Sequence, residues 1–167
     1  MATARNLAFS RQADSAFARV EKISAEVLFQ TFSAFVAAIS AEVESPNEEL
    51  GRVGRRLGVR LSDEMIAKFA SGLTIGNFTE ACDVVVKIGL KVYLGVASNS
   101  TAGSGNSHVY SFVADLEGTS TSGQLSANSA LSVFLCGVVT GVLSQLGYVV
   151  KVAQTEDSNA FTIELQE

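Results

Sequence analysis

Hydrophobic and polar positions in the first half of the chain repeat with the period of an α-helix. Apolar residues recur at helical spacing between Ser24, a plausible N-cap, and Val43. A second helix is predicted to begin at Pro46, because Ser45 can cap it and proline suits the first helical position. A third helix follows Asn77 and is apolar around most of its circumference. Such a helix is buried, so we place it at the centre of the domain.

The second half of the chain combines strand patterns with one more helix. Residues His108–Leu116 alternate with a period of two, which predicts a strand. An apolar helix is predicted from about Ala127 to Leu146, with Gly147 as the glycine that ends it. Residues 148–153 and 160–165 predict two strands joined by a short turn. This order indicates an α+β fold of four to five helices packed with a small antiparallel β-sheet.

The N-terminal segment differs in composition from the rest of the chain. Its residues are small, polar and weakly periodic, and Arg5, Arg11 and Arg19 interrupt any apolar run. We therefore expect a mobile N-terminal arm over residues 1–22 and a single domain over residues 23–167.

Composition limits the classes of function. The 167 residues are 47% hydrophobic and only 17% charged, so we expect part of the apolar surface to be covered by a partner. The net charge of −5 argues against nucleic acid as a ligand, since phosphate binding needs clustered Lys and Arg. No stretch reads as a signal peptide or membrane span, because the most apolar segment, Ala81–Ala97, is short and contains Asp83, Lys87 and Lys91.

The sequence contains no recognisable catalytic or metal-binding set of residues. Cys82 and Cys136 lie in apolar helical stretches, which favours small buried core residues over reactive thiols. The lone His108 has no cysteine partner for a transition-metal site. Residues 98–107, predicted as a loop, lack the Gly-Lys-Ser or Gly-Lys-Thr ending of a P-loop. We therefore predict a non-enzymatic protein that acts through surfaces and an interior groove.

Glycines and arginines in the helices leave two interpretations open. A glycine inside a helix costs up to about 1 kcal/mol relative to alanine. Gly137 and Gly141 stand four residues apart. Either close helix packing or the lining of a channel would explain why glycine occurs there despite that cost. The basic cluster consists of Arg52, Arg55, Arg56 and Arg60. It is either a solvated helix face or a contact for lipid headgroups or an acidic partner.

Three blocks in a fixed order carry a resemblance to a known family. They are Gly58–Leu61, Lys91–Gly95 and Leu135–Gly141. Together with Asn77–Val84 and the closing Phe161–Leu165, they extend the resemblance over all but the N-terminal segment. The chain resembles the Bet-type core subunit (component three) of the transport protein particle, the TRAPP vesicle-tethering complex.

The resemblance implies a structural, non-catalytic subunit with a helical layer on a short sheet and a flat, dimer-forming surface. The complex works in transport between the endoplasmic reticulum and the Golgi and acts as a guanine nucleotide exchange factor for a Rab GTPase. The partners implied are sister TRAPP small subunits, as a heterodimer or homodimer, and the GTPase through the complex. The implied location is cytoplasmic, peripheral at Golgi and endoplasmic reticulum membranes. The family's tail, which can reach the nucleotide site, has no counterpart before Glu167, which argues against a direct share in exchange.

The resemblance also implies a deep hydrophobic channel that can receive a fatty acyl chain on a cysteine. Ile75 stands nearest to the position of that cysteine, and residues 72–77 contain none. We therefore expect no covalent palmitate and no other cofactor. Residues expected to line the channel are Gly58, Phe69, Ile75, Phe78, Val85, Ile88, Gly89, Val92, Cys136 and Gly137.

A second class of function stays open. The same fold type occurs in prokaryotic four-vinyl-reductase-like sensor domains, which enclose small apolar molecules or lipids. Such a protein would be isolated as a monomer with a bound ligand, whereas a TRAPP subunit would be isolated with several small subunits. The Tyr-Leu-Gly and Leu-Cys-Gly-Val blocks favour the TRAPP interpretation.

Overall fold

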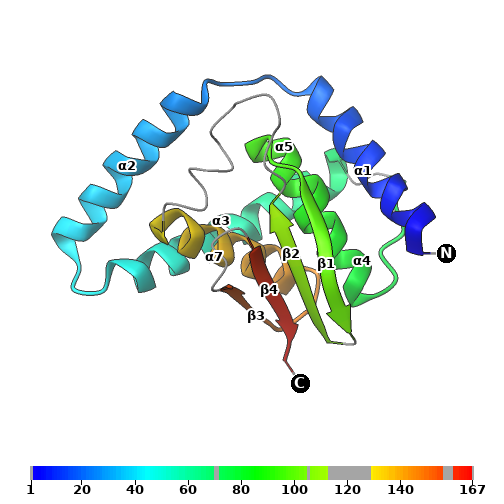
Figure 1. The fold of residues 1–167 in the computed structure, drawn as a ribbon. Coiled ribbons are helices and arrows are strands. Elements are labelled where there is room, and N and C mark those ends of the chain that lie inside the picture. Colours follow the sequence, from blue (N-terminus) through cyan, green and yellow to red (C-terminus); the bar gives the residue numbers. More distant parts are fainter. Residues whose placement is uncertain (1, 70–71, 105, 113–128, 156–159, 167) are drawn as a thin grey trace.

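The computed structural model of the chain describes residues 2–69, 72–104, 106–112, 129–155 and 160–166 (Figure 1). The helices are α1 Ala2–Arg19, α2 Ala25–Glu42, α3 Pro46–Phe69, α4 Phe78–Asp83, the π-helical segment η1 Val84–Gly89, α5 Leu90–Leu94 and α7 Ser129–Gln145. The strands are β1 Ser98–Ser104, β2 Ser107–Phe112, β3 Val150–Gln154 and β4 Ala160–Leu165. No helix in these described ranges is both long and apolar enough to span a membrane.

The four strands form one antiparallel sheet in the order β1-β2-β4-β3, and the sheet lies against the helical layer (Figure 1). Its buried side chains include Tyr110 of β2 and Phe161 and Ile163 of β4. Tyr110 is paired with Phe161 in the register, and their rings stack with centroids 5.9 Å apart. The α+β fold predicted from the sequence is thereby confirmed.

The predicted central helix is the segment α4–η1–α5. All six residues of η1 are buried, which agrees with the apolar pattern of the sequence. At its start the Asn77 side chain accepts a hydrogen bond from the Glu80 backbone N–H at 2.9 Å, so Asn77 is the N-cap. Gly95, with a φ of 71°, ends the helix in the left-handed conformation that glycine adopts without strain.

Helices α3 and α7 cross with their backbones in contact. A Cβ built on Gly58 would lie 2.1 Å from the Val138 carbonyl oxygen, and one built on Gly141 would lie 2.1 Å from the Arg55 carbonyl oxygen. The same holds at 2.2 and 2.3 Å for Gly54 and Gly137. Of the two interpretations of Gly137 and Gly141, close helix packing is therefore the one that the structure supports.

Two segments differ from the sequence prediction. Residues 2–19 form helix α1, not the predicted mobile arm, and bury Phe9, Ala13 and Ala16. Small alanines on the packed face gave too weak an apolar period to reveal this helix. The division of the chain into residues 1–22 and 23–167 stays a prediction.

The second difference concerns the predicted loop at 98–107. Residues 98–104 form β1, an edge strand whose composition is polar but which pairs with β2. The next predicted strand is present as β2, and its last predicted residues, 113–116, lie outside the described residues, as do residues 127–128 of the predicted last helix. Gly147, with a φ of 90°, follows α7 as predicted.

Candidate ligand cavity and partner surface

A cavity of about 230 Å³ lies among the helices, bounded by α2, α3, η1–α5 and α7. The residues that line it are Leu28, Leu57, Leu61, Met65, Val85, Gly89, Leu90, Tyr93, Leu94, Phe134, Leu135, Val138, Val139 and Val142. Among these described residues only Tyr93 has a polar side-chain group, and none is charged. Such a lining selects an apolar ligand. The volume of the cavity is slightly below the range of about 300–1,000 Å³ that is typical of ligand pockets.

Gly89 keeps the cavity open on the side of the central helix. Val85 lines the wall one turn earlier. A Cβ built on Gly89 would lie 3.1 Å from the Met65 Sδ, a flexible side-chain end, and would meet no backbone atom. The space beside Gly89 is therefore bordered by side chains, in contrast to the space beside Gly58 at the helix crossing.

The structure brings two of the ten predicted channel residues, Val85 and Gly89, to this cavity. Gly58 and Gly137 lie instead at the crossing of α3 and α7. Phe69, Ile88 and Val92 are buried in the main hydrophobic core. These residues are near the cavity in sequence but are not among the residues that line it.

The remaining predicted residues lie apart from the cavity. Ile75, in the segment before α4, is partly buried against the main core. Phe78 packs its ring against His108 and Tyr148, with centroids 5.4 Å apart in both pairs. Cys136 lines a second, small pocket of about 20 Å³ between α7 and the β3–β4 hairpin.

Twelve lining residues were missing from the sequence prediction, and helical spacing could have found several of them. Leu57, Leu61 and Met65 stand four residues apart on α3, so they share one face. Phe134, Val138 and Val142 repeat the same spacing on α7. Two such faces on helices that cross through glycines would have pointed to a shared apolar lining.

Both thiols are held in their protonated form. Burial, with the Asp83 carboxylate nearby, raises the pKa of Cys82 to about 12. Burial raises the pKa of Cys136 to about 11. Since the thiolate is the nucleophile, neither cysteine is activated by its surroundings.

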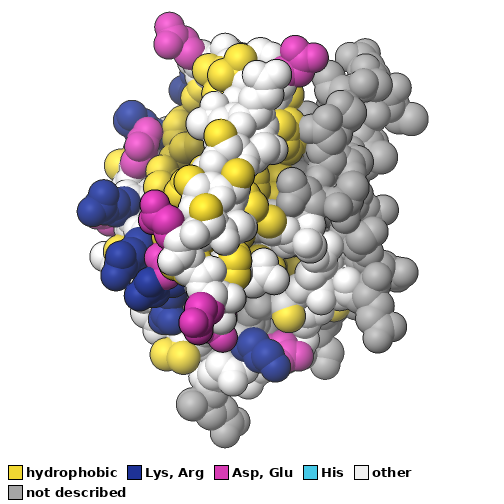
Figure 2. Space-filling view, turned by 90° about the vertical axis from the view of Figure 1, so that its left-hand side faces the viewer, with side chains coloured by type: hydrophobic (Ala, Val, Ile, Leu, Met, Phe, Trp, Pro, Cys, Tyr) yellow, Lys and Arg dark blue, Asp and Glu magenta, His cyan; other side chains and the backbone are white. Residues whose placement is uncertain are grey.

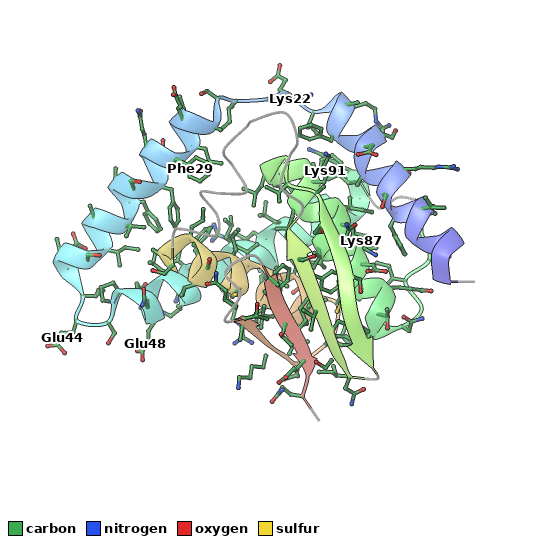
Figure 3. All side chains as sticks on the ribbon, in the orientation of Figure 1. Lys22, Phe29, Glu44, Glu48, Lys87 and Lys91 are labelled. Atoms are coloured by element: carbon green, nitrogen blue, oxygen red, sulfur yellow. The ribbon has the colours of Figure 1, made fainter. Side chains whose placement is uncertain are left out.

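Helix α2 is the second feature of interest, because it runs along the outside of the molecule (Figure 1) and has no buried residue. Its inner side touches the body through aromatic rings, among them Phe29, which Figure 3 shows on the side facing the body. The ring of Phe32 lies 5.4 Å from that of Phe134 on α7. On the outer side Val27 is 55% exposed. Phe35 is still 36% exposed, although its ring lies on the inner side with its centroid 6.5 Å from that of Phe134. An apolar helix this exposed is typical of an interaction surface.

The predicted basic cluster is exposed on α3. Arg52 forms an ion pair with Glu49. Arg55, Arg56 and Arg60 have no ion-pair partner within the described part of the chain. Figure 2 views the molecule from the side of α2 and shows Lys and Arg side chains grouped along one edge of a face with exposed hydrophobic side chains.

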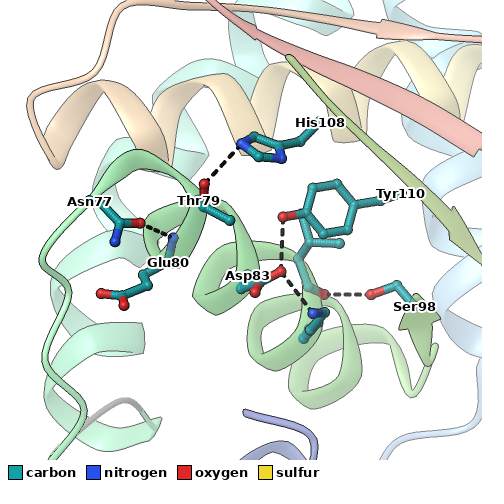
Figure 4. Close-up of polar contacts among 9 residues, drawn as sticks. Asn77, Thr79, Glu80, Asp83, Ser98, His108 and Tyr110 are labelled. Carbon is teal, nitrogen blue, oxygen red and sulfur yellow. Dashed lines mark hydrogen bonds and ion pairs between the residues drawn. The ribbon is translucent and has the colours of Figure 1, made fainter. Parts of the chain in front are cut away.

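Polar side chains connect the central helix to the sheet (Figure 4). Asp83 accepts a hydrogen bond from the Tyr110 hydroxyl at 2.9 Å and forms an ion pair with Lys87 at 2.8 Å. The Ser98 hydroxyl donates to the Val86 carbonyl oxygen at 3.2 Å. These groups are buried and open onto no described pocket, so they fix the helix on the sheet. No group of acidic, His or Cys side chains in the described residues could hold a metal ion.

Two relatives are named as subunits of a transport or trafficking protein particle. The chain is 27% identical to the transport protein particle subunit bet3 of Schizosaccharomyces pombe over 82% of its own length and 78% of the relative's. It is 28% identical to the trafficking protein particle complex subunit 3 of Dictyostelium discoideum over 86% and 80% of the two lengths.

A solved structure has the same fold and overturns one expectation. It is a trafficking protein particle complex subunit 3 from Naegleria fowleri covalently bound to palmitic acid, with a TM-score of 0.69, 24% identity, and coverage of 88% of this chain and 98% of that one. The expectation of no covalent palmitate was drawn from the lack of a cysteine near Ile75. That exclusion was wrong, because this neighbour with the same fold is covalently bound to palmitic acid and the described chain has two cysteines, Cys82 and Cys136.

The family model described as transport protein particle (TRAPP) component matches residues 26–166. It thus includes the cavity, α2, the basic cluster and the whole sheet, and leaves out α1. The chain belongs to the TRAPP component family and resembles its Bet3-type subunits.

Proposed function

We propose that this TRAPP component is a non-catalytic structural subunit that pairs through α2, with a sister small subunit or with a second copy of itself, and holds an acyl chain in its cavity. Within the complex it contributes to an assembly that tethers vesicles between the endoplasmic reticulum and the Golgi and acts as an exchange factor for a Rab GTPase. It works in the cytoplasm, peripheral at those membranes.

The observation that carries the proposal is the exposure of α2. Its 18 residues are largely apolar, and none of them is buried within the chain. Exposed apolar area contributes about 25 cal/mol per Å² when a partner covers it. A second subunit laid along α2 would supply that cover, which agrees with the naming of the relatives as subunits of a complex.

The cavity supports the acyl-chain part of the proposal. Its lining is uncharged and almost entirely hydrocarbon, so it offers partners to methylene groups and none to an ionic ligand. The structural neighbour with the same fold is covalently bound to palmitic acid. A fatty acyl chain is therefore the ligand class that suits this cavity.

The exposed arginines support a contact with anionic lipid headgroups. Guanidinium groups bind phosphate oxygens in pairs of hydrogen bonds, and Arg55, Arg56 and Arg60 are free to do so within the described part of the chain. Each basic residue near an anionic membrane surface contributes about 1 kcal/mol.

Sedimentation of the purified chain and of two variants tests the pairing. Val27→Asp introduces a negative charge on the exposed side of α2, whereas Lys151→Asp places one at an exposed position of β3 by reversing the charge there. We expect a dimer for the wild type and for Lys151→Asp, and a monomer for Val27→Asp. A wild-type chain that stays monomeric at high concentration, with a bound lipid, would instead favour the sensor-domain function.

A further inference from the structure

The cavity and the partner surface share helix α2. Leu28 of α2 lines the cavity. Its neighbour Val27 is 55% exposed, so adjacent positions of the same helix face the ligand space and the outside. Any movement of α2 therefore changes both sites at once.

Few contacts fix the position of α2. Its aromatic side chains, Phe29 and Phe32, pack on a small cluster around Val96 and Leu131 that is separate from the main core. None of the residues of α2 is buried. An element with so few buried apolar contacts opens at low free-energy cost, so its position responds to what binds beside it.

The residues that hold α2 also form the cavity wall. Leu94, Phe134 and Leu135 pack in the cluster that contacts α2, and all three line the cavity. A ligand in the cavity would add contacts to Leu28 and would fix the rings on which α2 rests. A subunit covering the outer side of α2 would fix the same helix from the other direction.

We propose that α2 couples ligand binding to assembly: an acyl chain in the cavity strengthens pairing through α2, and pairing strengthens the binding of the acyl chain. The inference rests on the proposed function, since it takes both sites from it. Linkage requires the two effects to be equal for each filled cavity, because ligand and partner act on one equilibrium. Coupling between two sites of this kind changes affinity by about 5- to 150-fold.

Titration of the full chain with palmitic acid, below its micelle-forming concentration, tests the coupling. Sedimentation equilibrium gives the dissociation constant of the dimer. Titrations are then done at protein concentrations well below and well above that constant. We expect palmitic acid to bind at least about fivefold more tightly to the dimer. Because each chain of the dimer has its own cavity, dimerisation should be strengthened by the square of that factor when both cavities are filled.

Two variants of neighbouring residues distinguish the contribution of the cavity from that of the partner surface. Leu28→Ala removes a cavity contact of α2 and should bring the ratio of the palmitic acid affinities of dimer and monomer toward one. Val27→Ala removes an exposed side chain and should weaken the dimer, while the affinity of the monomer for palmitic acid stays that of the wild type.

The outcomes distinguish the coupling from the function on which it rests. Equal palmitate affinity of monomer and dimer overturns the coupling and leaves the proposed function standing. Failure of both forms to bind palmitic acid overturns the coupling and the proposed role of the cavity. A chain that is monomeric with and without palmitic acid overturns the coupling and the proposed pairing of two copies of the chain.

Discussion

Replacing a single glycine at the crossing of α3 and α7 gives the sharpest test of the fold. Gly141→Ala places a Cβ 2.1 Å from the Arg55 carbonyl oxygen and 3.0 Å from the Val59 backbone nitrogen. Normal contacts between carbon and oxygen are about 3.3–3.6 Å, so the two helices would have to separate by roughly 1 Å. No side-chain rotation relieves this clash, because both atoms belong to the backbone.

Two effects of opposite sign determine the change in the free energy of unfolding. Overpacking costs about 1–3 kcal/mol, occasionally more, and two backbones in contact place this site at the upper end. Alanine gains up to about 1 kcal/mol over glycine by helix propensity. The net loss is about 2 kcal/mol, which lowers the melting temperature of a chain of this size by about 4–8 °C.

Gly51→Ala is the matched control on the same pair of helices. Its Cβ would lie 3.7 Å from Val133 Cγ1, an ordinary contact, so propensity should dominate and the melting temperature should rise by about 2–4 °C. Circular dichroism at one protein concentration measures both variants. Equal melting temperatures for Gly141→Ala and Gly51→Ala would refute the backbone contact.

Three further predictions concern the cavity and the buried polar groups. Gly89→Leu should fill the cavity and exclude any lipid that copurifies. It should change the melting temperature by no more than about 4 °C, because the Met65 thioether can shift; a larger drop in a calorimetric scan would mean that Gly89 is tightly packed. Asp83→Asn removes the carboxylate that forms an ion pair with buried Lys87 and should cost about 3–5 kcal/mol in urea unfolding. Glu64→Gln in the exposed pair with Lys68 should cost about 0.5 kcal/mol or less, and similar losses for the two variants would contradict this difference in burial. Burial lowers the pKa of His108, so on acidification the unfolded chain binds a proton before the folded protein does. The free energy of unfolding should therefore fall as the pH drops below about 6.5. His108→Gln should flatten this pH dependence of stability, and an unchanged dependence would show that other groups cause it.

The sequence predicted the elements whose apolar pattern is strong and whose ends are marked chemically. The helix start at Pro46, the helix that follows Asn77 and the helix end at Gly147 are all present in the structure. Helix α1 was missed because its buried face consists of Phe9 and small alanines, and β1 because its residues are polar and its strand form depends on pairing with β2.

The lining of the cavity was predictable only in small part. Gly58, Gly137 and Gly89 all follow the same rule in the sequence, a glycine inside an apolar helix. Their neighbours in space decide the outcome, since backbone oxygens lie beside the first two and the Met65 side chain beside Gly89. Helical spacing gives the faces of α3 and α7, but it does not give the angle and separation at which they cross.

Purification from native cells tests the central claim, that this chain is a structural TRAPP subunit held to its partner through α2. The tagged full chain and its Val27→Asp variant are isolated side by side, and the recovered proteins are identified by mass spectrometry. The account predicts that the wild type brings several other small proteins of the TRAPP component family in a fixed ratio, and that Val27→Asp loses at least one of them. A wild-type chain recovered alone, or a variant that retains every partner, would contradict it.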